Sequence, residues 1–66
     1  MTARETIDAD EVAAMTGLSA WSIYNLVRRG EIPHIRVGRR VLFRRSSILN
    51  WLEEQEQATK RQRLGV

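Results

Sequence analysis

A four-residue link, Thr16–Ser19, constrains the fold of this chain more than any other feature. It contains a glycine, Gly17, and it separates two short segments whose residue patterns predict helices. Two short helices joined by about four residues including glycine have the spacing of a helix-turn-helix. A link this short forces the second helix across the first rather than alongside it.

Capping residues mark the ends of both expected helices. Asp8 is the candidate N-cap of the first helix, and Glu11 three residues later completes an acidic variant of the capping box. Ser19 is the expected N-cap of the second helix, which then runs over Ala20–Arg29 and is closed by Gly30. The caps therefore define both helices by local sequence alone.

An alternating pattern follows Pro33, which ends the helical stretch because proline supplies no backbone donor. Ile35–Val37 and Val41–Phe43 flank the segment Gly38-Arg39-Arg40. This arrangement predicts a β-hairpin with a glycine-containing turn. Val41 and Phe43, at the two ends of its second strand, would face inward.

A last helix is expected after the hairpin, with Ser46 or Ser47 as its N-cap. Its apolar face would carry Ile48, Trp51, Leu52 and Gln55. The pair Glu56 and Lys60, four residues apart, favours a helix that reaches about residue 60 before it frays. The predicted fold is therefore mainly α with a small β-hairpin, in the order of a winged helix-turn-helix.

The length of 66 residues limits the chain to one marginal domain, because so short a chain buries only about 60% of its unfolded surface. We expect that domain over residues 1–57 and a basic, frayed tail over residues 58–66. The sequence has no cysteine, which excludes disulfides and thiolate metal sites. It has neither an apolar run near the roughly 18 residues of a membrane span nor a signal peptide. The expected location is the cytoplasm of a bacterial cell.

Positive charge is concentrated in the middle of the chain. Seven arginines lie between Arg28 and Arg45 and are offset only by Glu31, whereas the whole chain has a formal charge of +3. A clustered basic face is the electrostatic footprint of a nucleic-acid binder. The alternative is that a short chain simply uses arginine on its surface.

The second expected helix has two chemically different faces. At about 100° per residue, Ile23, Leu26 and Val27 form one apolar stripe that faces the core. The opposite face carries an amide, a guanidinium and a large aromatic ring. Asparagine can form two bonds to adenine, and arginine can form two to guanine. The candidate DNA contacts on this face and its flanks are Trp21, Tyr24, Asn25, Arg28 and Arg29.

Four of these side chains have a second interpretation. Trp21 could be covered by the N-terminal residues or by a neighbouring protomer. Asn25 could be a solvated surface residue, and Arg28 could merely complement the dipole of the helix C-terminus. Tyr24 is either a hydroxyl that contacts phosphate or a half-buried edge of the core.

The hairpin is the second candidate contact. A flexible turn at Gly38 can enter a minor groove, where the negative potential of narrow A·T tracts favours arginine. Two further arginines follow on the way to the last helix and are candidate phosphate contacts. The alternative is a solvated polar hairpin. The candidate contacts of the hairpin are Arg36, Gly38, Arg39, Arg40, Arg44 and Arg45.

Spaced blocks of the sequence resemble a known family. The blocks are Asp10–Ala13, Gly17–Ser19, Ile23–Pro33, Arg36–Arg40 and Ile48–Leu52. Over about residues 7–53 they are similar to the excisionase-type subgroup of small MerR-like winged helix-turn-helix proteins. The resemblance implies that the second helix enters the major groove and that the hairpin is the wing in the adjacent minor groove.

The resemblance also implies individual contacts, with two departures from the family pattern. Ala20 and Trp21 stand where the family often has smaller or basic polar residues, so its base preference does not transfer to this chain. Leu42 is apolar where an outward polar residue is common, which suggests a protein contact on the wing. The favoured contacts are Ser22, Tyr24, Asn25, Arg28, Arg39 and Arg40, and Ala20 completes the candidate set of the helix.

The sequence leaves three functions open, and none is enzymatic. The only histidine, His34, lies beside a proline without a neighbouring carboxylate, and we expect no catalytic site, metal or cofactor. The first function is a phage or bacterial excisionase that binds repeats head-to-tail, bends attachment-site DNA and assists a separate integrase. The second is a small transcription regulator at an operator. The third is a protein-interaction module that uses Trp21, Leu42 and the tail Lys60–Val66.

Overall fold

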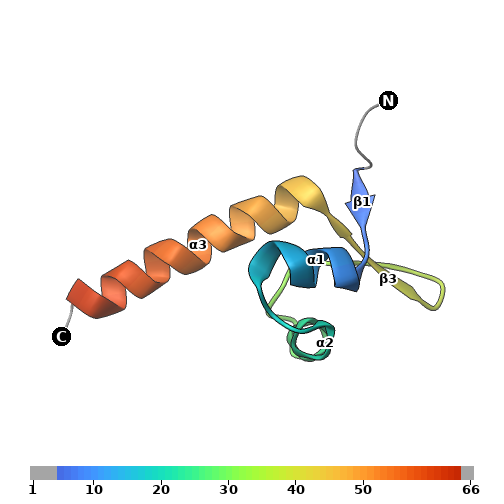
Figure 1. Ribbon diagram of the computed structural model, residues 1–66, viewed down its shortest axis with the longest axis horizontal. Coiled ribbons are helices and arrows are strands. Elements are labelled where there is room, and N and C mark those ends of the chain that lie inside the picture. Colours follow the sequence, from blue (N-terminus) through green and yellow to red (C-terminus); the bar gives the residue numbers. More distant parts are fainter. Residues whose placement is uncertain (1–4, 65–66) are drawn as a thin grey trace.

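The computed structural model describes residues 5–64, with side chains over residues 5–60. Its helices and small sheet form a body from which one helix projects (Figure 1). The elements are β1 (Thr6–Ile7), α1 (Ala9–Thr16), α2 (Ala20–Arg28), β2 (Ile35–Val37), β3 (Arg40–Arg44) and α3 (Arg45–Leu64). The prediction of a mainly helical winged helix-turn-helix is confirmed.

The caps predicted for α1 are present. The Asp8 carboxylate accepts a hydrogen bond from the backbone N–H of Glu11 at 2.9 Å, and the Glu11 carboxylate accepts one from the N–H of Asp8 at 3.3 Å. Gly17 ends the helix with φ of 78°, a left-handed conformation that side chains disfavour. Its N–H donates to the carbonyl of Ala13 at 2.8 Å, so the turn begins with a satisfied backbone.

The helix α2 starts where the sequence predicts and ends one residue earlier. The Ser19 hydroxyl accepts from the N–H of Ser22 at 3.1 Å and forms the N-cap. The last helical residue is Arg28, and Arg29 is the C-cap. Gly30 then has φ of 69°, which closes the helix in a left-handed conformation.

The hairpin belongs to a three-stranded antiparallel sheet with the order β1-β3-β2. Its turn consists of Gly38 and Arg39, since Val37 pairs with Arg40. The expected glycine-containing turn is confirmed, and Arg40 is the first residue of β3. Gly38 has φ of 59° and Arg39 has no positive φ, which is the pattern of a type II′ turn with glycine first.

The strand β1 was not expected from the sequence. Its two residues pair with the end of β3, Thr6 opposite Arg44 and Ile7 opposite Phe43. The pairing places Ile7 and Phe43 on the face of the sheet that is turned toward the helices, and both side chains are buried.

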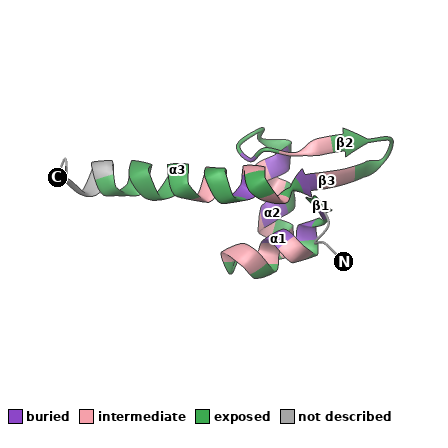
Figure 2. Cartoon of the chain, turned by 90° about the horizontal axis from the view of Figure 1, so that it is seen from above, coloured by how far each residue is buried: buried purple, intermediate pink, exposed green. Residues whose placement is uncertain are grey.

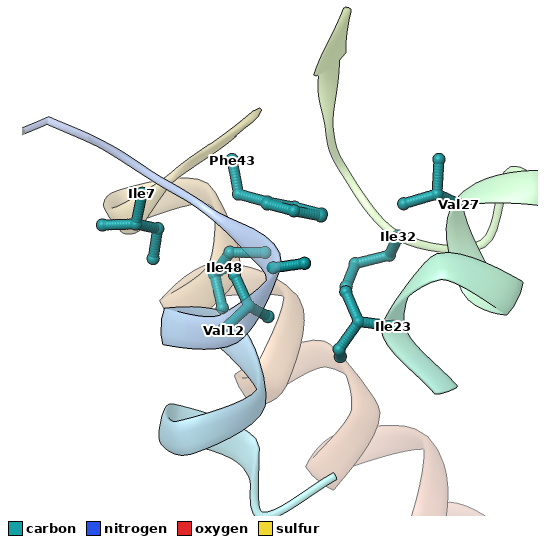
Figure 3. Packing of buried hydrophobic residues seen from close by; sticks show 8 residues of the cluster. Ile7, Val12, Ile23, Val27, Ile32, Phe43 and Ile48 are labelled. Carbon is teal, nitrogen blue, oxygen red and sulfur yellow. The ribbon is translucent and has the colours of Figure 1, made fainter. Parts of the chain in front are cut away.

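One apolar core joins all three helices to the sheet (Figure 3). The side chains of α2 in this core are Ile23 and Val27, which lie on the predicted inward stripe, while Leu26 packs beside them half-buried. Val41 also packs against the core, as expected for the inward face of the hairpin. The buried residues are Ile7, Ala9, Val12, Ile23, Val27, Ile32, Phe43 and Ile48.

The helix α3 begins at Arg45, so the prediction that Ser46 or Ser47 caps it is wrong. The chain is held here by β1, because the N–H of Arg45 donates to the carbonyl of Glu5 at 3.0 Å. The Ser46 hydroxyl is 3.4 Å from the Glu5 carboxylate and donates to it rather than capping the helix. Backbone and side-chain contacts with Glu5 therefore hold the start of α3 against β1.

Only the first turns of α3 pack on the body (Figure 2). Ile48 is buried, Trp51 and Leu52 are half-buried, and the expected fourth member of that face, Gln55, is exposed. The Trp51 indole N–H donates to the carbonyl of Glu31 at 2.9 Å and ties α3 to the loop after α2.

Beyond Leu52, α3 projects from the body with an exposed surface (Figure 2). It continues past residue 60 to Leu64 and crosses the expected domain boundary at residue 57 without a break. No helix of the described part of the chain is long and apolar enough to cross a lipid bilayer.

Candidate nucleic-acid interface

The exposed side of α2 carries the predicted recognition residues. Buried Ile23 and Val27 fix the opposite side of the helix against the core. Trp21 is 76% exposed, so the body formed by the described residues does not cover it. Arg28 and Arg29 are exposed, whereas Ala20, Ser22 and Asn25 are half-buried.

Asn25 is positioned by its own helix. One of its side-chain N–H groups donates to the carbonyl of Trp21, one turn earlier, at 3.1 Å. An asparagine amide has two N–H donors and one carbonyl acceptor. The recorded bond leaves one donor and the acceptor, which is the pair needed for adenine N7 and N6.

Ser22 contributes to the cap as well as to the surface. Its hydroxyl oxygen accepts from the Ser19 hydroxyl at 3.1 Å, and its backbone N–H donates to the same hydroxyl. The first turn of α2 is therefore held by the link that precedes it. Its first residue, Ala20, offers only a methyl group at this end of the helix.

Tyr24 connects α2 to the wing, the β2–β3 hairpin Ile35–Arg44. The tyrosine is 48% exposed and is not among the side chains packed against the core. It lines a hollow of about 320 Å³ together with Arg39, Arg40 and Val41 of the wing. Asp8 and Asp10, at the N-terminus of α1, also line this hollow. Tyr24 therefore places one flank of α2 beside the basic turn of the wing.

The wing arginines near the turn are exposed but do not share one face. Arg36 pairs with Val41 and lies on the face of the sheet turned toward the helices, whereas Arg40 pairs with Val37 on the other face. Arg39 occupies the second position of the turn beside Gly38. Within the described residues, no ion pair joins these three arginines to a carboxylate. Their charge is available to a ligand.

The base of the wing differs from its turn. The Arg44 Nε is 3.4 Å from the Glu5 carboxylate, so the charge of Arg44 is partly offset. Arg45 is half-buried at the start of α3, and its buried Nε has no hydrogen-bond partner among the described residues. The structure therefore places Arg44 and Arg45 at the end of β3 opposite the turn, apart from Arg39.

Leu42 lies on the outer face of the wing, as the departure from the family pattern suggested. It pairs with Ile35 across the hairpin, and both are half-buried. Val37, on the same face, is 57% exposed. Leu42 therefore has apolar neighbours within the wing itself.

Two residues near the site were not among those predicted from the sequence. Leu18 is 43% exposed and adjoins Trp21, and its position three residues before the tryptophan was the available signal. Glu5 pairs with Arg44, but only the β1–β3 pairing brings these residues together.

The histidine and the carboxylates have no arrangement typical of a metal centre. The His34 Nδ1 lies 2.9 Å from the carbonyl of Ile32, a local contact within the loop before β2. Over residues 5–60, no group of three or more histidine or carboxylate side chains is arranged to hold a metal ion.

Comparison with known proteins gives one match. A family model described as a helix-turn-helix domain matches residues 6–56, which include α1, α2, the wing and the packed start of α3. Searches of curated proteins and of solved structures each returned no match.

Proposed function

The chain belongs to the helix-turn-helix domain family of small DNA-binding proteins, and we propose that it recognises a specific sequence in double-stranded DNA. In this proposal α2 lies in the major groove and the wing enters the adjacent minor groove. The observation that supports it is that α2 presents Trp21 and Asn25 on its outer side, while Tyr24 of the same helix lines a hollow with Arg39 and Arg40 of the wing. Phosphate contacts would orient the protein, and contacts to base edges would provide specificity.

The surface divides these two tasks between its parts. Arg28 and Asn25 project from a helix fixed by the core and have the chemistry to read base edges. Arg36, Arg39 and Arg40 on the wing form no ion pair with the carboxylates of residues 5–60 and would neutralise phosphates or lie in a narrow minor groove. Arg44, Arg45 and Arg29 are further candidates for phosphate contacts.

We propose that the biological role is that of an excisionase of the MerR-like type. Several copies would bind adjacent repeats at an attachment site in a bacterial cell, bend the DNA and assist a separate integrase. The similarity of five sequence blocks to that subgroup supports this role. The projecting end of α3 also supports it, since its exposed Glu53–Lys60 surface is free to meet a recombinase or the next copy in a head-to-tail array.

The first test is binding to duplex DNA at several salt concentrations. If about five phosphates are neutralised, log affinity falls with log salt at a slope near −4.5. A duplex selected from a randomised pool should bind far more tightly than an unrelated duplex of equal length. Affinity no better than that of any protein with a charge of +3 would instead favour a protein-interaction module.

The second test separates excision from transcription. Footprinting on a cognate attachment site should show protection of repeated sites, and the purified protein should stimulate excision by the integrase in vitro. Protection of an operator with altered transcription and no stimulation of excision would contradict the excisionase role. That result would establish a small transcription regulator with the same DNA-binding surface.

A further inference from the structure

An apolar hollow lies along α2, and its lining includes residues of the link before α2, of α2 itself and of its C-cap. Leu18, Trp21 and Leu26 supply its apolar wall, and the hollow has a volume of about 410 Å³. Trp21 is 76% exposed and Leu18 is 43% exposed. The polar residues Ser22, Asn25 and Arg29 complete the lining. An apolar surface is therefore enclosed by groups that can contact DNA.

The position of the hollow on α2 indicates what can enter it. Leu18 precedes the helix and Trp21 lies in its first turn. In helix-turn-helix proteins the N-terminal residues of the second helix contact base edges in the major groove. The carbonyl of Trp21 also holds the Asn25 amide, so the apolar wall and the amide are fixed to each other one helical turn apart.

We propose that Trp21 and Leu18 contact the C5-methyl group of a thymine, at a base pair next to the one that Asn25 reads. This inference rests on the proposed binding to duplex DNA. The thymine methyl is the apolar group that a base pair presents in the major groove, and apolar side chains recognise it by contact. Arg29, just after the last residue of α2, would lie toward the phosphates, which suits a wall that is apolar in the middle and cationic at its edge.

A second copy of the chain is the competing occupant, and the hollow fits it less well. A stable protein interface buries about 800 Å² on each partner. That area is about 15% of the 5293 Å² of accessible surface of this molecule. At this place only Leu18 and Trp21, among the described residues, are exposed large apolar side chains. The polar side chains that line the hollow can form hydrogen bonds with the edge of a base pair. An apolar protein surface would offer them no such partners.

The experiment replaces single thymines by deoxyuridine, which removes only the methyl group. The probe is the duplex selected from the randomised pool, with one substitution at a time. One position should bind about fourfold more weakly, the factor that corresponds to one buried methyl group. The remaining positions should change little, because their methyl groups would not touch the protein.

The variant Trp21→Ala completes a double-mutant cycle between protein and DNA. In the Trp21→Ala variant, replacing thymine by deoxyuridine at the sensitive position should no longer weaken binding. In the Leu18→Ala variant, the same replacement should weaken binding by less than fourfold. Leu49→Ala removes a leucine of α3 that is 54% exposed, compared with 43% for Leu18, and should leave the effect intact. Because Trp21 is 76% exposed, its replacement should leave the far-UV circular dichroism of the fold unchanged.

Each outcome distinguishes the inference from the function on which it depends. Binding without any uracil-sensitive position overturns the inference and leaves the proposed function intact. A fourfold effect that persists in Trp21→Ala also overturns it. If Trp21→Ala abolishes self-association in sedimentation without altering the methyl effect, the hollow holds a second copy instead. Failure to bind any duplex specifically removes the proposed function itself.

Discussion

The helix α2 and the wing face the same ligand in this proposal but are supported in different ways. The buried side chains of Ile23 and Val27 anchor α2 in the core, and Ser19 and Arg29 cap its two ends. In the wing, Phe43 is the one buried side chain, and β2 contributes none. The helix is therefore fixed along its length, whereas the wing is fixed at one end.

This difference suits two kinds of contact. A bidentate hydrogen bond to a base requires donor–acceptor distances near 3 Å and good angles, so its side chain needs a rigid support. Attraction between a guanidinium and phosphates declines slowly over about 10 Å at moderate salt and tolerates movement. We therefore expect specificity to depend on α2 and salt-dependent affinity to depend on the wing.

The largest expected effect comes from removing the anchor of the wing. Phe43→Ala should cost about 3–5 kcal/mol of unfolding free energy, since the aromatic ring is fully buried. A domain of this length has a total of roughly 3–10 kcal/mol. The variant should be largely unfolded in thermal or urea denaturation followed by circular dichroism.

Leu42→Ala is the matched control for that experiment. Leu42 is the neighbouring residue of β3 on the outer face and is only half-buried, so its loss should cost clearly less. Equal destabilisation by the two substitutions would mean that the outer face of the wing also supports the fold, contrary to the comparison above.

The next largest effect tests α2 as the reader of sequence. Asn25→Ala should cost about 1–3 kcal/mol of binding free energy for the selected duplex. The loss should be confined to one base position, because the remaining donor and acceptor of the amide can pair with only one adenine. Binding to duplexes altered at each position in turn measures this. A uniform loss across all sequences would refute the base-reading role of Asn25.

The ends of α1 and α2 were predictable from sequence because their determinants are local. Asp8 and Glu11 cap each other across three residues, and Ser19 reaches only to Ser22. The strand β1 was not predictable, since two residues carry no periodicity and its pairing partner lies near Arg44. The start of α3 was mispredicted for the same reason, because a distant backbone carbonyl holds it.

The candidate site likewise has one part that the local sequence predicts and another part that depends on tertiary contacts. The helical period predicted that Trp21, Asn25 and Arg28 share one side of α2, and the structure leaves that side exposed or half-exposed. The proximity of Tyr24 to the wing is a tertiary contact, and no spacing in the sequence indicates it. The partial neutralisation of Arg44 likewise depends on the unexpected β1–β3 pairing.

A smaller effect tests the wing as the source of salt dependence. Arg39→Ala and Arg40→Ala should each flatten the slope of log affinity against log salt by about 0.9, if each side chain neutralises one phosphate. The loss should be similar for specific and unrelated duplexes. Titrations at four or more salt concentrations measure the slope.

Arg44→Ala sharpens that test, because Arg44 already lies 3.4 Å from the Glu5 carboxylate. We expect a smaller change of slope than at the turn. A change as large as that of Arg39→Ala would extend the phosphate contact to the base of the wing. A loss confined to one base position would mean that the wing reads sequence, and the division of labour with α2 would fail.

The smallest effect belongs to the projecting end of α3, which lies outside both regions. The Lys60 ammonium is 3.7 Å from the Glu56 carboxylate one turn earlier, with both side chains well exposed. Lys60→Ala should therefore cost about 0.3–0.5 kcal/mol of helix stability, and high salt should abolish the difference. Circular dichroism at low and high salt measures it, with Gln57→Ala as a control on the same exposed stretch. The salt slope of DNA binding should not change. A decrease of about 0.9 in that slope would mean that α3 itself reaches a phosphate, and the helix and the wing would no longer account for the whole contact.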